Sequence, residues 1–375
     1  MGPTLKRRAR AVLLGAIGLG LGVIALGTTV GWFLSEPGHR GPVTDHFDGT
    51  EFVNTIPTHR GDLRSGLEML RNWRRGPWEE WTEVPPQPDP PERVDDLRVT
   101  FINHATVLVQ TAGINLLLDP IWSDRCSAVQ FAGPKRHHPP GLRFDQLPPI
   151  DAVLISHNHY DHLDLGTLEQ LESHGPVLIT GLGNGDILER NGHDRVVELD
   201  WNDTTTVGPL TIVGQEVRHF SSRGMFDRNK TLWLGFVIDG PAGPIYFAGD
   251  TGDGPHFRET AAAHGPFRLA ILPIGAYLPR WVMAPVHIDP GAAVQAHLDL
   301  GAHRSLAVHF GTFRLSNEGQ QDPPVDLAAA AHAAGLGPDD FWALQPGEGR
   351  DVPRLPSTDP AGEETATAPT ATPSQ

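Results

Sequence analysis

Ser156 to Asp164 holds the residues whose types and spacing point most directly to chemistry. Three histidines and one aspartate fall within six positions: His157, His159, Asp161 and His162. They follow the apolar run Val153 to Ile155, which is typical of a buried strand, so the strand delivers them together at its C-terminal end. If the segment stays extended, the first three point to one side and His162 turns toward a neighbouring centre. Imidazole and carboxylate suit zinc, and less selectively iron or manganese, so we expect a metal site rather than a histidine-rich surface loop.

Further ligands for such a site should also stand just past apolar strands. Three residues meet this condition: His219 after Thr211 to Val217, Asp250 after Pro244 to Gly249, and His309 after Ser305 to Val308. With them the inventory is five histidines and two aspartates, enough for two metals that share one carboxylate and one water. Two metals roughly 3.5–4 Å apart activate water at neutral pH and clamp both oxygens of a displacement at phosphorus or at a carbonyl carbon.

The pattern His157-x-His159-x-Asp161-His162, with its three downstream partners, resembles the metallo-β-lactamase superfamily. From about Val99 to about Val325 the chain also resembles, more narrowly, the N-acylphosphatidylethanolamine-hydrolysing phospholipase D family and its bacterial membrane-anchored relatives. The matching blocks occur in the same order with similar spacing: Phe101 to Val109, Gly133 to Arg136, Ser156 to Asp164, Glu198 to Trp201, Phe247 to Gly252, Pro273 to Tyr277, Pro279 to Trp281 and His309 to Phe313. The ligand motif is specific to the superfamily, whereas the blocks are specific to the narrower family.

This resemblance implies an α/β fold, the αβ/βα sandwich of two mixed sheets with outer helices. It also implies two Zn²⁺, with iron or manganese as alternatives, and hydrolysis of a phospholipid to phosphatidic acid and N-acylethanolamine. One metal would be held by His157, His159 and His219, the other by Asp161, His162 and His309, with Asp250 as the bridge. His219 is alternatively a strand-end histidine, because its neighbours match only loosely. A lactonase, a different phosphodiesterase or a non-enzymatic binding protein stay open, although the complete ligand set argues against the last.

Asp161 and His287 are the catalytic candidates that the resemblance implies, Asp161 through its metal. His287 precedes a helix that Asp289 and Pro290 should begin. It either faces solvent or, by resemblance, lies near the head group, where it would donate to a substrate oxygen or protonate the leaving alkoxide. Tyr277 and Trp281 belong to an apolar loop that either packs in the core or accepts acyl chains.

Other polar residues near these segments either have two alternative roles or are expected to support the ligands. Lys135 and Arg136 either hold a phosphate or form a solvated turn. We expect Asp164 to accept a hydrogen bond from a ligand imidazole, since such acceptors orient metal ligands. We interpret Asp119 as a supporting or structural residue, and His104 as structural rather than a ligand.

Alternating strands and helices must position these residues. We expect strands at Arg98 to Val109 and Ile114 to Leu118, joined by a tight turn at Ala112-Gly113. Further strand and helix pieces follow: Leu165 to Ser173, Val177 to Thr180, Asp186 to Asn191, Val196 to Leu199, Leu232 to Asp239, Leu269 to Leu272, Asp289 to Leu300, Val325 to Gly335 and Phe341 to Leu344. Two strand-rich halves with outer helices are what a sandwich of two mixed sheets would give.

Four regions are expected along the chain. Residues 1–35 are an anchor or signal, 36–95 a Pro- and Trp-rich extension, 96–352 the hydrolase domain, and 353–375 a disordered tail rich in Pro, Thr, Ala and Glu. Within the extension, Leu63 to Trp73 could be one short helix. The tryptophans of the extension either pack on the domain or form a membrane-facing surface.

Ala11 to Ser35 contains no charged residue and follows four basic residues at positions 6–10. Roughly 20 apolar residues cross a bilayer, and a basic N-terminal flank stays in the cytoplasm, so we expect an uncleaved anchor with the catalytic domain outside the cytoplasm. An exported and cleaved protein is the alternative, with a weak cleavage site at Ala25-Leu26-Gly27.

Charge decides which partners are plausible. Five of the 29 basic and one of the 45 acidic residues lie within residues 1–40, so the remainder has a net charge of −20. This excess disfavours nucleic acid as a partner and repels an anionic membrane surface. The expected partners are a phospholipid substrate and the membrane that tethers the chain, and a homodimer stays open. The single cysteine, Cys126, excludes an intrachain disulfide and is interpreted as an ordinary loop residue.

Overall fold

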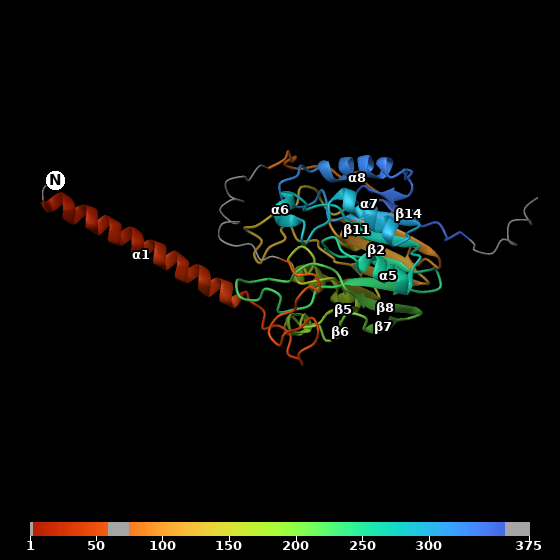
Figure 1. The fold of residues 1–375 in the computed structure, drawn as a ribbon, viewed down its shortest axis with the longest axis horizontal. Coiled ribbons are helices and arrows are strands. Elements are labelled where there is room, and N and C mark those ends of the chain that lie inside the picture. The colour runs from red at the N-terminus through yellow and green to blue at the C-terminus, as the bar shows by residue number, and fades with distance from the viewer. Residues whose placement is uncertain (1–2, 59–74, 357–375) are drawn as a thin grey trace, which may run out of the picture.

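Two seven-stranded β-sheets face each other across a shared apolar core (Figure 1). The structure is a computed structural model that describes residues 3–58 and 75–356, with the side chains of 3–13 and 24 left out. The expected helix at Leu63 to Trp73 and the tail from Ser357 lie outside the described residues.

The first sheet has an antiparallel half and a parallel half. Its strands, in spatial order, are β14 (Gly349–Asp351), β1 (Leu97–Asn103), β2 (Thr106–Thr111), β3 (Ile114–Leu118), β4 (Ala152–Ile155), β5 (Val177–Gly181) and β6 (Val196–Leu199). Strands β3 to β6 run parallel, and β3, β4 and β5 are mostly apolar and almost fully buried because both of their faces are covered.

The second sheet is built in the same way. Its order is β13 (Phe341–Trp342), β12 (Arg304–Val308), β11 (Leu269–Pro273), β10 (Ile245–Phe247), β9 (Gly235–Asp239), β8 (Leu210–Gln215) and β7 (Thr204–Val207). The pairs from β10 to β13 are parallel, and those from β7 to β10 are antiparallel.

Helices cover the outer faces of both sheets. On the first sheet, α3 (Leu165–Leu171) and α4 (Gly185–Arg190) pack through Leu168, Leu171, Ile187 and Leu188. On the second sheet lie α5 (His256–His264), α7 (Pro290–Asp299) and α8 (Asp322–Ala333). The remaining short helices are η1 (Phe144–Gln146), η2 (Glu172–His174) and α6 (Arg280–Met283). The predicted sandwich of two mixed sheets with outer helices is therefore confirmed.

One expected strand is in fact two. Arg98 to Val109 folds into β1 and β2, joined by a tight turn at His104 and Ala105. No glycine or proline marks the turn in the sequence, because His104 makes it with a left-handed φ of 47°. The hairpin at Ala112-Gly113 is confirmed, since both residues have positive φ, as a two-residue turn between twisted strands requires. Strands β7 and β14 and helix α5 were not expected from the sequence.

The segment before β1 contributes to the core. Phe47 and Phe52 are almost fully buried and belong to the apolar cluster between the sheets. Trp78 donates its indole N–H to the backbone oxygen of Glu318 at 2.9 Å, whereas Trp81 is 45% exposed. Ordinary packing therefore accounts for Trp78, and Trp81 stays on the surface.

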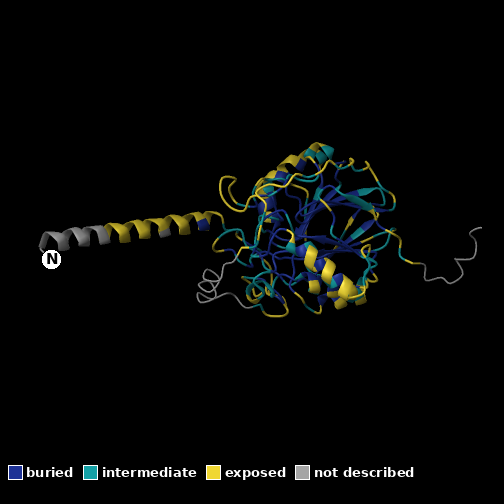
Figure 2. Cartoon of the chain, turned by 90° about the horizontal axis from the view of Figure 1, so that it is seen from above, coloured by how far each residue is buried: buried dark blue, intermediate teal, exposed yellow. Residues whose placement is uncertain are grey.

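Helix α1 (Pro3–Phe33) extends away from the sandwich (Figures 1 and 2). Its stretch Leu14–Phe33 is long and apolar enough to cross a membrane, with a mean hydropathy of 1.8, and apart from Gly31 its described side chains are exposed. The end of the helix touches the sandwich at one loop, where the Met225 amide donates to the Gly31 oxygen at 3.3 Å. The Phe226 amide donates to Ser35 Oγ at 2.9 Å.

Candidate metal centre

The ends of four strands bring the predicted ligands to one edge of the sandwich. His157 to His162 follow β4, His219 follows β8, Asp250 follows β10 and His309 follows β12. Five of the seven side chains are buried, and His159 and Asp161 are half-buried. The structure brings all seven together, because parallel strands of both sheets end at this edge.

The first group comprises His157, His159 and His219. Nε2 of His157 lies 2.7 Å from Nδ1 of His159, which lies 3.2 Å from Nε2 of His219. These three nitrogens could hold one metal ion. His219 therefore points into the cluster with His157 and His159, although the residues around it match the family pattern only loosely.

The second group comprises Asp161, His162 and His309. Asp161 Oδ2 lies 3.5 Å from His162 Nε2 and 3.3 Å from His309 Nε2. Asp250 stands between the groups: its Oδ2 is 3.1 Å from His309 Nε2, 3.2 Å from His162 Nε2 and 3.7 Å from His219 Nε2. The structure is compatible with the two sets that the resemblance implied, but His104 also lies within reach of the second set. Two further possible ligand sets overlap with them: His157, His162 and Asp250, and His219, Asp250 and His287.

Two of the predicted ligands, His219 and His162, are oriented by a hydrogen bond from the ring nitrogen that faces away from the cluster. The other ring nitrogen, Nε2, therefore points into the cluster. Nδ1 of His219 donates to the Val286 oxygen at 2.9 Å, and Nδ1 of His162 donates to Asp119 Oδ2 at 2.6 Å. Such bonds fix the tautomer and leave Nε2 as a lone-pair donor for a metal.

Several atoms of the cluster are buried without a protein partner. Among the described residues, nothing hydrogen-bonds to His162 Nε2, to either ring nitrogen of His309, or to Asp250 Oδ1. Buried polar atoms are nearly always satisfied, so this convergent set of imidazoles and carboxylates fits metal ions.

The carboxylates and imidazoles of the cluster shift one another's pKa. Burial opposes ionisation of Asp161 and Asp250, but the neighbouring histidines outweigh it and hold the pKa of both carboxyls well below its usual range. Burial also opposes charge on His309, yet Asp250 and Asp161 raise its pKa to about 9. Metal ions must displace such protons when they bind.

His287 faces the cluster rather than solvent. It is 7% exposed, and its Nδ1 lies 3.9 Å from Asp250 Oδ2. This nitrogen has no hydrogen-bond partner within the described part of the chain, and burial lowers the pKa of the imidazole to about 4. The solvent-facing alternative is therefore wrong. The predicted start of the next helix is confirmed, since Asp289 accepts a hydrogen bond from the Ala292 amide and Pro290 follows.

Tyr277 and Trp281, the two substrate-binding candidates from the apolar loop, differ in burial. Tyr277 is buried, and its hydroxyl donates to Asp326 Oδ2 of α8 at 2.5 Å, so this side chain packs in the core. Trp281 lies on α6 with 47% of its surface exposed. Of the two, Trp281 is the one available to an acyl chain.

Both interpretations of Arg136 are wrong. The side chain is 2% exposed, and it donates to the backbone oxygens of Ser123 at 3.0 Å and Ile121 at 3.2 Å. Its guanidinium also lies over the Phe313 ring, 5.4 Å from the centroid. A planar group with five donors can satisfy several buried carbonyls at once, and residue type alone does not reveal that use.

The hydrogen bond from a ligand imidazole that we expected Asp164 to accept is accepted by Asp119 instead. Asp164 accepts hydrogen bonds from Ser123 and Thr167 and from none of the described histidines. Asp119 is fully buried, accepts from His162 Nδ1, and also accepts from the amide and hydroxyl of Ser156. Its position directly after β3 is the same strand-end signal that identified the ligands.

His104, which we interpreted from the sequence as a structural residue, contacts one of the predicted ligands. Its Nε2 lies 2.9 Å from Asp161 Oδ2, and the ring is buried at the edge of the second group. Cys126 is buried, free and located in a loop, as its interpretation as an ordinary loop residue requires.

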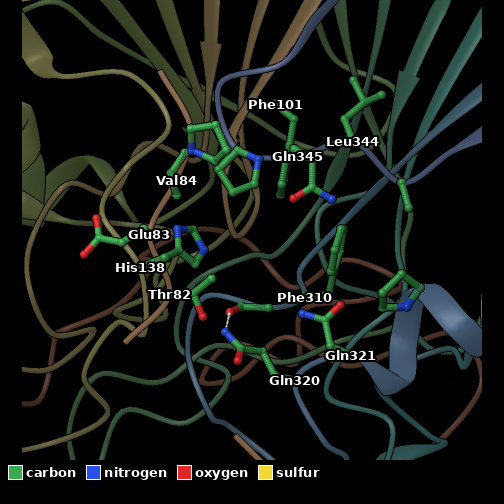
Figure 3. Close-up of a pocket in the computed structure, with 15 residues that line it drawn as sticks. Thr82, Glu83, Val84, Phe101, His138, Phe310, Gln320, Gln321, Leu344 and Gln345 are labelled. Atoms are coloured by element: carbon green, nitrogen blue, oxygen red, sulfur yellow. Dashed lines mark hydrogen bonds between the residues drawn. The ribbon is translucent and has the colours of Figure 1, made fainter. Parts of the chain in front are cut away.

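A separate pocket borders the segment that follows His309 (Figure 3). Phe101, Phe310 and Gln345 line it, and Gln320 donates to the Gly311 oxygen at 3.0 Å along its wall. None of the seven predicted ligands lines this pocket, so it is distinct from the metal cluster.

Comparison with known proteins agrees with this geometry. A family model described as a beta-lactamase superfamily domain matches residues 114–310, which include all seven predicted ligands. An uncharacterised protein of Mycobacterium tuberculosis is 45% identical over 242 residues, 63% of this chain and 64% of that protein. N-acyl-phosphatidylethanolamine-hydrolyzing phospholipase D 1 of Caenorhabditis elegans is 37% identical over 229 residues, 58% of this chain and 64% of that protein. The chain thus spans 64% of the length of each of these two relatives.

A solved structure shares the architecture. Igni18, a metallo hydrolase from the archaeon Ignicoccus hospitalis, aligns with a TM-score of 0.53 over 68% of this chain and 97% of its own. At 20% identity this likeness shows the fold alone.

Proposed function

Because the chain belongs to the metallo-β-lactamase superfamily, we propose that its metal-dependent hydrolase site is a dinuclear phosphodiesterase that cleaves N-acylphosphatidylethanolamine to phosphatidic acid and N-acylethanolamine. The observation that carries this proposal is the position of Asp250 Oδ2, within 3.7 Å of ligand nitrogens from both groups. A single carboxylate oxygen so placed can serve two metals at once. The similarity to the Caenorhabditis elegans phospholipase and the matching sequence blocks support the substrate.

The chain would hold the two metals through the two groups described. His157, His159 and His219 would hold one ion, and the second group would hold the other, with Asp250 between them. When bound, two such ions activate water and stabilise the charge that develops on a phosphoryl oxygen. Zinc suits the mixed nitrogen and oxygen donors, and iron or manganese would also be compatible.

The chain's own groups would orient the lipid and donate to it. His287 Nδ1 is buried, unpartnered among the described residues, and directed at the cluster, so it can donate a hydrogen bond to a phosphate oxygen. Burial lowers the pKa of this imidazole to about 4, so protonation of the leaving alkoxide would require the anionic phosphate to raise that pKa. Arg280 fixes the loop that carries it, since Nη1 donates to the His287 oxygen at 2.9 Å and Nε pairs with Asp289 at 3.1 Å. The exposed face of Trp281 on the same loop would receive an acyl chain.

The reaction can be tested by the position of an isotope label. Purified protein that hydrolyses N-acylphosphatidylethanolamine in ¹⁸O water should place the label in phosphatidic acid, because water attacks phosphorus and the ethanolamine oxygen leaves. Mass spectrometry of both products measures this, with unlabelled water as the control. Label in the N-acylethanolamine would contradict attack at phosphorus. Efficient opening of acyl lactones, with this lipid and its diester analogues untouched, would favour the lactonase alternative.

We further propose that α1 anchors the chain with the sandwich outside the cytoplasm. Trp32 and Phe33 at its end are exposed, as are Met225 and Phe226 on the loop that it contacts. These four apolar side chains would lie together at the membrane surface, where aromatic residues are favoured.

Protease accessibility tests this orientation. Protease added to cells with a permeable outer envelope and an intact inner membrane should degrade the sandwich, while a cytoplasmic marker stays protected. Degradation only after lysis would reverse the orientation. A soluble form that begins near Thr28 would show an exported and cleaved protein instead.

A further inference from the structure

We propose that His104 is a positioning residue that holds Asp161 and His309 in place and thereby sets the affinity of the second group for its metal. The inference rests on the proposed dinuclear site. It adds a residue from the β1–β2 turn, outside both ligand groups, that would control one of them.

The imidazole of His104 holds the carboxylate of Asp161. Its Nε2 lies 2.9 Å from Asp161 Oδ2, a hydrogen-bond distance for a ring N–H and a carboxylate. The same oxygen lies 3.3 Å from His309 Nε2 and 3.5 Å from His162 Nε2. Since an aspartate can rotate about two bonds, this donor keeps Oδ2 pointed at the position that the other two ligands face.

The backbone of His104 holds the turn that carries His309. The His309 amide donates to the His104 oxygen at 2.7 Å, and the His104 amide donates to Thr312 Oγ1 at 2.8 Å. The two rings pack with their centroids 4.2 Å apart. One residue therefore links a turn of the first sheet to the end of β12 in the second sheet.

Both histidines have an uncommon backbone conformation. φ is 47° at His104 and 63° at His309, in the left-handed region that only a few per cent of non-glycine residues adopt, although histidine does so more often than most. Such conformations persist where surrounding contacts impose them, and they concentrate at functional sites. Glycine would form both turns with less strain, so the imidazole at each position has a use of its own.

The contacts of His104 favour a donor over an additional ligand. Nε2 of His162 and Nε2 of His309 each lie within 3.5 Å of both Asp161 Oδ2 and Asp250 Oδ2, whereas His104 Nε2 approaches Asp161 alone among the described carboxylates. Its contact with Asp161, at 2.9 Å, has the length of a direct hydrogen bond, although the ring also lies near enough to Asp161, His162 and His309 to join them around an ion.

Zinc titration of chelator-stripped protein against a competing chelator tests the proposal. Wild-type protein should bind two ions. His104→Gly keeps the left-handed backbone and removes only the ring. It should bind the first ion as wild type does and the second about 10- to 100-fold more weakly, the usual cost of losing a group that orients a ligand. His104→Gln, which retains a side-chain N–H donor, should recover part of the loss.

The matched control is His297→Gln, which changes a buried histidine of α7 whose Nδ1 contacts Ser305 Oγ at 2.8 Å, away from both groups. It should bind both ions as wild type does. If His104→Gly does not fold by circular dichroism, His104→Asn decides in its place, since asparagine tolerates the left-handed region and its amide ends short of Asp161.

The outcomes separate the two proposals. Wild-type protein that binds fewer than two ions overturns the dinuclear site. Two ions in wild type, and equally tight binding of both by folded His104→Gly, overturn the role of His104 alone. Loss of the second ion as complete as in Asp161→Ala would make His104 a ligand, and the positioning role would again be wrong.

Discussion

Replacing Asp250 with alanine should remove most of the bound metal and lower turnover by roughly a thousandfold or more. Asp250 Oδ2 approaches ligand nitrogens of both groups, so in the proposed dinuclear site its loss would take a donor from each metal at once. Paired metals supply several kcal/mol of transition-state stabilisation, and about 1.4 kcal/mol corresponds to tenfold in rate.

Elemental analysis and turnover on the same preparation would measure both effects. Asp253→Ala is the matched control, because it removes an exposed carboxylate three residues further along the same loop. It should keep two ions and full activity. A folded Asp250→Ala protein with two ions per chain would show that the carboxylate is not a bridge, and active wild-type protein without stoichiometric metal would remove the basis of the site.

The ligand set could be predicted from the sequence because one physical rule governs it. Parallel strands that are apolar on both faces end at a common edge, and polar residues directly after them meet there. His157, Asp250 and His309 all stand within three residues of such a strand end. His219 lies further from β8, and its place in the cluster depends on the hydrogen bond from Nδ1 to the Val286 oxygen, which no local pattern shows.

The residues around the ligands were harder to assign, because their roles depend on contacts between distant segments. Asp119 accepts from Ser156, which precedes the first group, and from His162, which belongs to the second. Asp164 has the same residue type in a nearby position, yet it binds Ser123 and Thr167. Only the tertiary structure distinguishes these two acids.

The metal loop is also tied to the segment that contacts α1. Arg223 Nη1 donates to the backbone oxygens of Asn158 and Leu163, both at 2.9 Å, and its guanidinium lies 3.9 Å from the centroid of the Tyr160 ring. The nearby Met225 and Phe226 donate hydrogen bonds to Gly31, in the last turn of α1, and to Ser35, just after its end. The loop that presents four of the ligands is therefore held by the same segment that meets the proposed anchor.

Replacing His287 with alanine should lower turnover by about tenfold to a thousandfold and leave two metals bound. The range covers loss of a general acid or of a single donor to a developing oxyanion. Metal should be retained because each proposed group holds three ligands without His287, whose Nδ1 lies 3.9 Å from Asp250 Oδ2. His287 also lies close enough to His219 and Asp250 to form a further possible ligand set, so the metal content decides between the two roles.

Steady-state turnover and metal content, measured together, distinguish the roles open to His287. His287→Gln keeps a donor but cannot transfer a proton at neutral pH, so it should recover activity if the residue stabilises an oxyanion and stay impaired if it protonates the leaving alkoxide. His332→Ala, which removes an exposed histidine of α8, is the control and should behave as wild type. Loss of one metal in His287→Ala would make this residue part of the metal site, and unchanged turnover would exclude it from the reaction.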